Sequence, residues 1–154
     1  MRDVESTYRR YFPVIREKTR RMLGDADAQD VAQETFVRLW QAAIDETDTR
    51  RVTAWIYKTC TRLAINRLRE QARRPGGEDG LLELPARLTG PDEALAQRRQ
   101  LQQLVRELPG QELEVALLSR VDRLTHEEIG EVLGISDRTV RRCLERLGQR
   151  VGTR

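Results

Sequence analysis

Apolar residues recur three and four positions apart over most of the chain, whereas the alternating pattern of a half-buried strand is nearly absent. The clearest example lies near the C-terminus, where two short stretches, 125–133 and 136–149, each carry one apolar face. The apolar positions are Ile129, Val132, Leu133, Val140, Leu144 and Leu147. The pattern predicts two amphipathic helices that are separated by a tight turn.

The residues around this turn have the chemistry that helix ends require. Thr125 and Glu128 have capping-box spacing at the start of the first helix. Gly134 can adopt the left-handed conformation that ends a helix, and Ser136 can cap the helix that follows. We therefore expect a helix-turn-helix.

The face of the second helix opposite its apolar residues is rich in arginine. An apolar back and a basic front suit a helix that lies in a DNA major groove, although a solvated helical hairpin is the alternative. Arg141 and Arg142 are the candidates for base contacts, because arginine can bind guanine through two hydrogen bonds. Arg138 and Thr139 are expected at phosphates. The remaining candidates are Glu145, which could accept from cytosine or pair with an arginine, and Arg146.

Helical periodicity also covers the rest of the chain. It predicts helices over about 4–22, 27–43, 52–73, 92–108 and 111–121, with Pro13 as a kink and Gly24 as the end of the first helix. Arg74-Pro75-Gly76-Gly77 then breaks the pattern. We expect an all-α protein in which two small helical domains, 1–74 and 92–154, are joined by a flexible linker, 75–91. The leucines of this linker could dock on a partner or form a short local helix. Such a linker would leave neither domain held in register with the other in the free chain.

Charge is unevenly distributed, although the net charge of the 154 residues is only +3. Acids dominate residues 25–48, and bases dominate residues 50–74. This change of sign favours neighbouring helices that face one basic and one anionic partner. Cys60 and Cys143 lie in helical patterns and are expected as core residues of a reduced protein. Without a membrane-spanning apolar run or a signal-peptide pattern, we expect a cytoplasmic protein.

Two further helix faces are candidate sites. On the second predicted helix, Asp30, Gln33, Glu34 and Val37 share one side, which suits docking on a basic surface or simple solvation. Trp40 and Trp55 are expected to pack in the core. The third predicted helix carries groups that can follow phosphates, bind an adenine edge or stack on a base. These candidates are Tyr57, Lys58, Arg62, Asn66, Arg69 and Arg73.

Several segments together resemble the sigma factors of the extracytoplasmic-function (ECF) group. The segment Asp27–Trp40 is similar to region 2.2, and 54–69 is similar to the promoter-melting and −10-reading regions. The Leu108-Pro109 step, the helix around 114–118 and the helix-turn-helix resemble region 4. Three departures are Arg62 in place of the usual asparagine, Asn66 in place of aspartate and Gly130 in place of alanine.

The resemblance implies partners and roles. Core RNA polymerase would bind through its β′ clamp helices and its β flap, and promoter DNA would be read at the −10 and −35 elements. The loop 45–51 would help to capture a flipped base. An anti-sigma factor is a further candidate partner, since one protein could bury both polymerase-binding faces. The resemblance implies no cofactor.

Two other functions fit parts of the sequence. An autonomous helix-turn-helix regulator would bind its operator without polymerase and would need a dimerising N-terminal domain. An enzyme acting on DNA would need clustered metal ligands or a nucleophile beside a base, and the sequence groups neither. His126 is the only histidine, and it has no companions that would make a metal or catalytic site. We therefore expect no enzyme, no metal and no membrane insertion.

Overall fold

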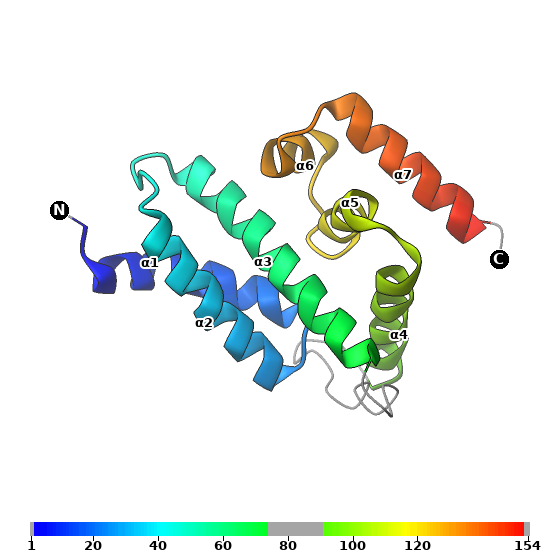
Figure 1. Cartoon of the computed structure of the whole chain (residues 1–154), viewed down its shortest axis with the longest axis horizontal. Helices are drawn as coiled ribbons and strands as arrows, with labels where there is room; N and C mark the ends of the chain where they lie inside the picture. Colours follow the sequence, from blue (N-terminus) through cyan, green and yellow to red (C-terminus); the bar gives the residue numbers. More distant parts are fainter. Residues whose placement is uncertain (1, 74–90, 153–154) are drawn as a thin grey trace.

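The computed structural model describes residues 2–73 and 91–152, all of whose regular elements are α-helices (Figure 1). The helices are α1 (Val4–Arg20), α2 (Asp25–Ala42), α3 (Thr49–Arg73), α4 (Pro91–Glu107), α5 (Gly110–Arg120), α6 (His126–Leu133) and α7 (Asp137–Gly152). The all-α prediction is confirmed. The predicted linker lies outside the described residues except for Pro91, which begins α4.

Helices α1, α2 and α3 form the N-terminal group. Asp3 begins α1 by accepting hydrogen bonds from the backbone N–H groups of Glu5 and Ser6. The helix continues through Pro13 and ends at Arg20, so the expectation that Gly24 ends it was wrong; Gly24 instead precedes α2 as its N-cap. One core cluster of this group consists of Tyr11, Phe12, Ile15, Ala32, Phe36, Leu39, Val52 and Ile56.

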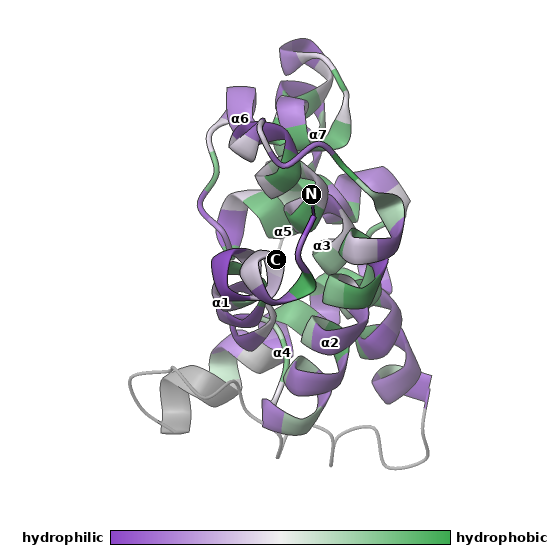
Figure 2. Cartoon of the chain, turned by 90° about the vertical axis from the view of Figure 1, so that its left-hand side faces the viewer, coloured by the Kyte–Doolittle hydropathy of each residue, from purple (hydrophilic) through white to green (hydrophobic). Residues whose placement is uncertain are grey.

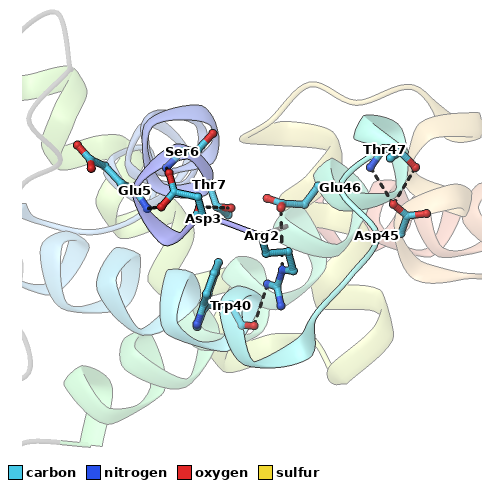
Figure 3. A network of polar contacts seen from close by, with 9 residues as sticks. All are labelled: Arg2, Asp3, Glu5, Ser6, Thr7, Trp40, Asp45, Glu46 and Thr47. Atoms are coloured by element: carbon cyan, nitrogen blue, oxygen red, sulfur yellow. Dashed lines mark hydrogen bonds and ion pairs between the residues drawn. The ribbon is translucent and has the colours of Figure 1, made fainter.

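Arg2 near the N-terminus contacts the last turns of α2 and the loop that follows, where it pairs with Glu46 at 4.0 Å (Figure 3). The Arg2 guanidinium donates to the carbonyl oxygen of Trp40 at 2.9 Å, and its central carbon lies 4.2 Å from the centre of the Trp40 ring. Within the loop, the Asp45 carboxylate accepts from the backbone N–H and the hydroxyl of Thr47, and these bonds lower the pKa of Asp45. Trp40 is only partly buried, so it lies at the edge of the core under Arg2 rather than inside it.

Helices α4 to α7 form the C-terminal group, and its helix-turn-helix is built as the sequence predicts. The Thr125 side chain accepts from the backbone N–H of Glu128, whose carboxylate accepts from the N–H of Thr125. Gly134 ends α6 with a φ of 68°. The backbone N–H of Thr139 donates to the Ser136 hydroxyl at 3.1 Å, which caps α7. Val115, Leu118, Ile129, Val140 and Cys143 are buried beneath the two helices.

Gly130 lies where α6 approaches the following turn too closely for a side chain. A Cβ atom at this position would lie 2.8 Å from the carbonyl oxygen of Ile135. We expect Gly130→Ala to lower the free energy of unfolding by about 1 kcal/mol, because overpacking against backbone exceeds the gain in helix propensity. Gly148→Ala is the matched control, since nothing lies within 4 Å of its added Cβ, and we expect it to be neutral or stabilising. Urea unfolding followed by circular dichroism measures both, and equal effects would contradict the steric argument.

The two helical groups pack against each other. Helix α3 contacts α4, α5 and α6 as well as α1 and α2. One buried cluster is continuous across both groups, with Met22, Leu63 and Leu68 on one side and Leu104 and Leu117 on the other. Apolar segments accordingly gather where helices face one another, and hydrophilic ones lie along the outer faces (Figure 2). The expectation that neither domain is held in register was therefore wrong for this structure.

Candidate nucleic-acid and protein interfaces

The outer face of α7 is the most accessible of the predicted surfaces. Arg138, Arg141, Arg142 and Arg146 are exposed, whereas Val140, Cys143 and Leu147 turn inward and are buried. Nearby carboxylates hold two of the arginines: Arg141 pairs with Asp137 at 3.0 Å, and Arg146 pairs with Glu112 of α5 at 3.0 Å. The capping bond with Ser136 holds Thr139, which is partly buried, and Glu145 is exposed. The buried residues therefore fix the orientation of α7, and its guanidinium groups lie on the face that points to solvent.

The predicted α3 face is divided between two environments. Asn66, Arg69 and Arg73 line an open hollow of about 440 Å³ together with Val105 and Arg106 of α4. Arg106 adds a fourth basic or amide group that the sequence did not single out. This part of the face can accept a phosphate-bearing chain, because its polar groups converge on open space.

Closer to the start of α3, two of the predicted residues contact the C-terminal group. The Arg62 guanidinium pairs with Glu114 of α5 at 2.7 Å. The Tyr57 ring packs against the cluster beneath α6 and α7, and the Lys18 ammonium lies 5.2 Å from its centre. Lys58 is partly buried. The structure therefore brings Asn66, Arg69 and Arg73 together, while Tyr57 and Arg62 face the other helical group.

Sequence reasoning missed the ionic network that joins the two groups. Asp122, in the turn after α5, accepts from the Lys18 ammonium at 2.5 Å and from the Arg21 guanidinium at 2.8 Å. The side chains of Lys18 and Asp122 are fully buried. The partners are more than a hundred positions apart in the sequence, so no local pattern could have paired them.

Both cysteines are buried free thiols, as predicted. Cys60 lies in the cluster shared by the two groups, and its burial raises the pKa of its thiol to about 11. Burial also raises the pKa of Cys143. The thiols are therefore protonated at neutral pH, which makes them poor nucleophiles and suits packing rather than chemistry.

On α2, the four predicted residues form one exposed row, which we call the α2 stripe. Asp30, Gln33 and Glu34 face solvent, and the Val37 side chain is 51% exposed, which is unusual for a large apolar residue. Glu34 pairs within its own helix, with Arg38 at 2.9 Å. Tyr8 of α1, which the sequence placed with the apolar residues, is 44% exposed and lies edge-on to Phe36. The α2 stripe therefore combines exposed carboxylates with one exposed apolar side chain.

The part of the chain that the structure describes contains neither a candidate metal cluster nor a candidate membrane span. Within 2–73 and 91–152 no group of three or more histidine, cysteine, aspartate or glutamate side chains could hold a metal ion. None of the helices in these ranges is long and apolar enough to cross a membrane.

Comparison with known proteins defines the class. Residues 7–74 match the family model for sigma-70 region 2, and residues 98–147 match that for sigma-70 region 4. A region 2 followed by a region 4 is the architecture of a sigma factor, which is a transcription initiation factor and not a catalytic enzyme.

Individual relatives narrow the class. The chain is 32% identical over 140 residues to the ECF RNA polymerase sigma factor SigW of Bacillus subtilis, an alignment that covers 82% of this chain and 74% of SigW. It is 30% identical to the sigma factor CnrH of Cupriavidus metallidurans, covering 77% of this chain and 68% of CnrH. It is also 30% identical to the ferric citrate uptake sigma factor FecI of Escherichia coli, covering 80% and 73%. The chain belongs to the ECF group of the sigma-70 family and is an alternative sigma factor that directs transcription initiation.

Proposed function

We propose that three separate faces of this sigma factor divide the work of initiation. The α2 stripe binds core RNA polymerase, the α3 face holds the melted −10 strand and the α7 face reads the −35 element. One observation carries the proposal: each face lies on a helix whose opposite side is buried in a hydrophobic core. The core fixes the orientation of the helix, and the functional side chains themselves are not needed for packing. The domains that we propose for these roles are 1–74 and 92–154.

The α2 stripe is the proposed polymerase contact. Asp30, Gln33 and Glu34 supply two charges and an amide, and Val37 supplies apolar surface that water solvates poorly. Their partner would be a basic helical surface, for which the β′ clamp helices are the candidate. The C-terminal domain would dock on the β flap. Localisation in the cytoplasm follows from such partners.

The α3 and α7 faces are the proposed DNA contacts. Asn66, Arg69 and Arg73 converge on one hollow, which suits a single strand whose phosphates attract guanidinium groups. On α7, Arg141 and Arg142 would reach base edges in the major groove, and Arg138 and Thr139 would hold phosphates. No covalent bond is made or broken by these contacts. In the proposed mechanism, the free energy of binding to polymerase and to the two promoter elements directs initiation.

Transcription in vitro tests this function. We expect core RNA polymerase from the source bacterium to initiate at discrete sites on fragmented genomic DNA only when the chain is added, with transcript 5′ ends mapped by sequencing. Each DNA-binding domain is small, so the isolated chain should bind the promoters so identified weakly, and polymerase should raise the effective concentration of each domain. Nanomolar, sequence-specific binding of duplex DNA without polymerase, together with no effect on initiation, would instead favour an autonomous regulator.

A further inference from the structure

Carboxylates of the C-terminal group pair with bases of the N-terminal group at three places along their contact. Asp122 pairs with Lys18 and Arg21, as described above. Glu131 of α6 pairs with Arg50 at 2.6 Å, and Glu114 of α5 pairs with Arg62 at 2.7 Å. Each of these pairs has its acid on the C-terminal group and its base on the N-terminal group. The two groups therefore meet through surfaces of complementary charge.

The bases at two of these places lie on the helix that we propose for strand binding. Arg50 is in the first turn of α3, and Arg62 is twelve positions later, about 18 Å along the helix axis. Tyr57 lies between them and packs against the C-terminal cluster. The C-terminal group thus contacts α3 at points between Arg50 and Arg62, and the hollow at Asn66, Arg69 and Arg73 stays open.

We propose that the C-terminal domain inhibits the N-terminal domain of the free protein by placing Glu114 and Glu131 where phosphates of the −10 strand would bind. The proposal rests on the proposed function of α3. A carboxylate and a phosphate are both acceptors of charge-assisted hydrogen bonds from arginine, so one excludes the other at a given guanidinium. The strand can occupy the whole of α3 only after the two domains separate.

The ion pairs differ in how much they stabilise the closed arrangement, in which the two helical groups are in contact. The Lys18–Asp122 pair is fully buried, so removing the carboxylate would leave an ammonium group without its partner in an apolar contact. The side chains of Arg50 and Arg62 are 71% and 51% exposed, so their pairs are weak and screened by salt. Asp122 therefore acts as the latch, and Glu114 and Glu131 act as occupants of the strand site.

Packing at the α6 end of the contact is incomplete. A hollow of about 390 Å³ remains between the first half of α3 and α6, lined by residues that include Thr53, Tyr57, Leu124 and Val132. Missing contacts weaken the cohesion of a docked surface. The ion pair at Asp122 is buried, whereas the contact at α6 leaves open space beside the exposed Arg50–Glu131 pair.

Two measurements on the full chain test the proposal: the radius of gyration from small-angle X-ray scattering, and the affinity for a fluorescein-labelled single-stranded 20-mer of mixed sequence. We expect Asp122→Asn to raise the radius of gyration and to tighten oligonucleotide binding by about ten-fold or more. Glu114→Gln/Glu131→Gln should tighten binding with little change in size, because the latch remains. Adding Arg62→Ala to Asp122→Asn should remove part of the gain. Circular dichroism confirms that each variant stays helical.

The matched control is Glu5→Gln/Asp25→Asn. It makes the same change of net charge as the double glutamine variant, at two exposed acids of α1 and α2 that lie outside the proposed DNA-binding faces. If both double variants bind the oligonucleotide equally more tightly, net charge alone explains the effect and the proposal is overturned. A radius of gyration that Asp122→Asn leaves unchanged would also overturn it. A further variant tests separately whether α3 binds the strand at all. Arg69 and Arg73 lie beyond the ion pairs with the C-terminal group. If α3 does not bind the strand, Arg69→Ala/Arg73→Ala will not weaken oligonucleotide binding in any background.

Discussion

Replacing Asp30 and Glu34 with lysine is expected to weaken binding to core RNA polymerase by about 100-fold. Both side chains are exposed, so the reversal removes attraction to a basic partner and adds repulsion. Like charges brought together at an interface cost several kcal/mol, and about 3 kcal/mol corresponds to a factor of 100 or more in the dissociation constant. Surface plasmon resonance with immobilised core polymerase measures the change.

Folding should survive this variant. Within residues 2–73 and 91–152, these two acids form a single ion pair, Glu34–Arg38, which is exposed and joins adjacent turns of α2. Such pairs contribute about 0.3–0.5 kcal/mol. Glu5→Lys/Glu70→Lys is the control, because it changes the net charge equally at exposed acids outside α2 and breaks the comparable Glu5–Arg9 pair. If the control weakens binding as much as the α2 variant, the polymerase face lies elsewhere.

Removing either Arg141 or Arg142 should cost promoter recognition about 1–3 kcal/mol, a loss of roughly 5- to 150-fold at the base pairs that it reads. The structure supports both as candidates, because both are exposed on the outer face of α7. Arg141 must leave Asp137 to reach a base, whereas Arg142 pairs with no carboxylate in the part of the chain that the structure describes. We therefore expect Arg142→Ala to have the larger effect. Promoter variants substituted one position at a time in the −35 element, bound by the holoenzyme, provide the measurement.

Arg138→Ala separates base reading from phosphate contact. A phosphate contact carries no sequence information, so this change should weaken all promoter variants alike and lower the salt slope by about one unit. Arg142→Ala should instead relax the preference at one or two positions. A preference that stays intact in the Arg141→Ala and Arg142→Ala variants would show that these arginines do not face the bases.

The helix-turn-helix could be predicted residue by residue because its signals are local. Thr125, Gly134 and Ser136 each act on backbone groups within four positions, and the structure places each in the predicted role. Helix positions were predicted for the same reason, with boundaries displaced by a few residues at most. Gly130, which departs from the family pattern, is explained by contact with Ile135, a neighbour in the turn.

The contact between the two helical groups could not be predicted in this way. A periodic pattern shows which face of a helix is apolar, but not which distant surface will cover it. An aromatic ring on a basic helix can stack on an unpaired base, which makes Tyr57 a candidate for strand contact, yet its ring packs against the C-terminal cluster. Asp122 stands in a short turn with no distinctive pattern, and its importance depends on Lys18, which only the folded chain brings near.

In the proposed scheme, Arg62 pairs with Glu114 in the free protein and with a phosphate of the −10 strand on the promoter. In the free protein, Arg62→Ala would remove a strand contact and also the pair with Glu114 that favours the closed arrangement. The two effects on apparent affinity have opposite signs, since a larger open fraction raises it while a lost contact lowers it. Free-chain titrations would therefore understate what this guanidinium contributes, whereas polymerase that holds the domains apart would reveal the full loss. The difference between the two titrations reports the free energy of the Arg62–Glu114 pair.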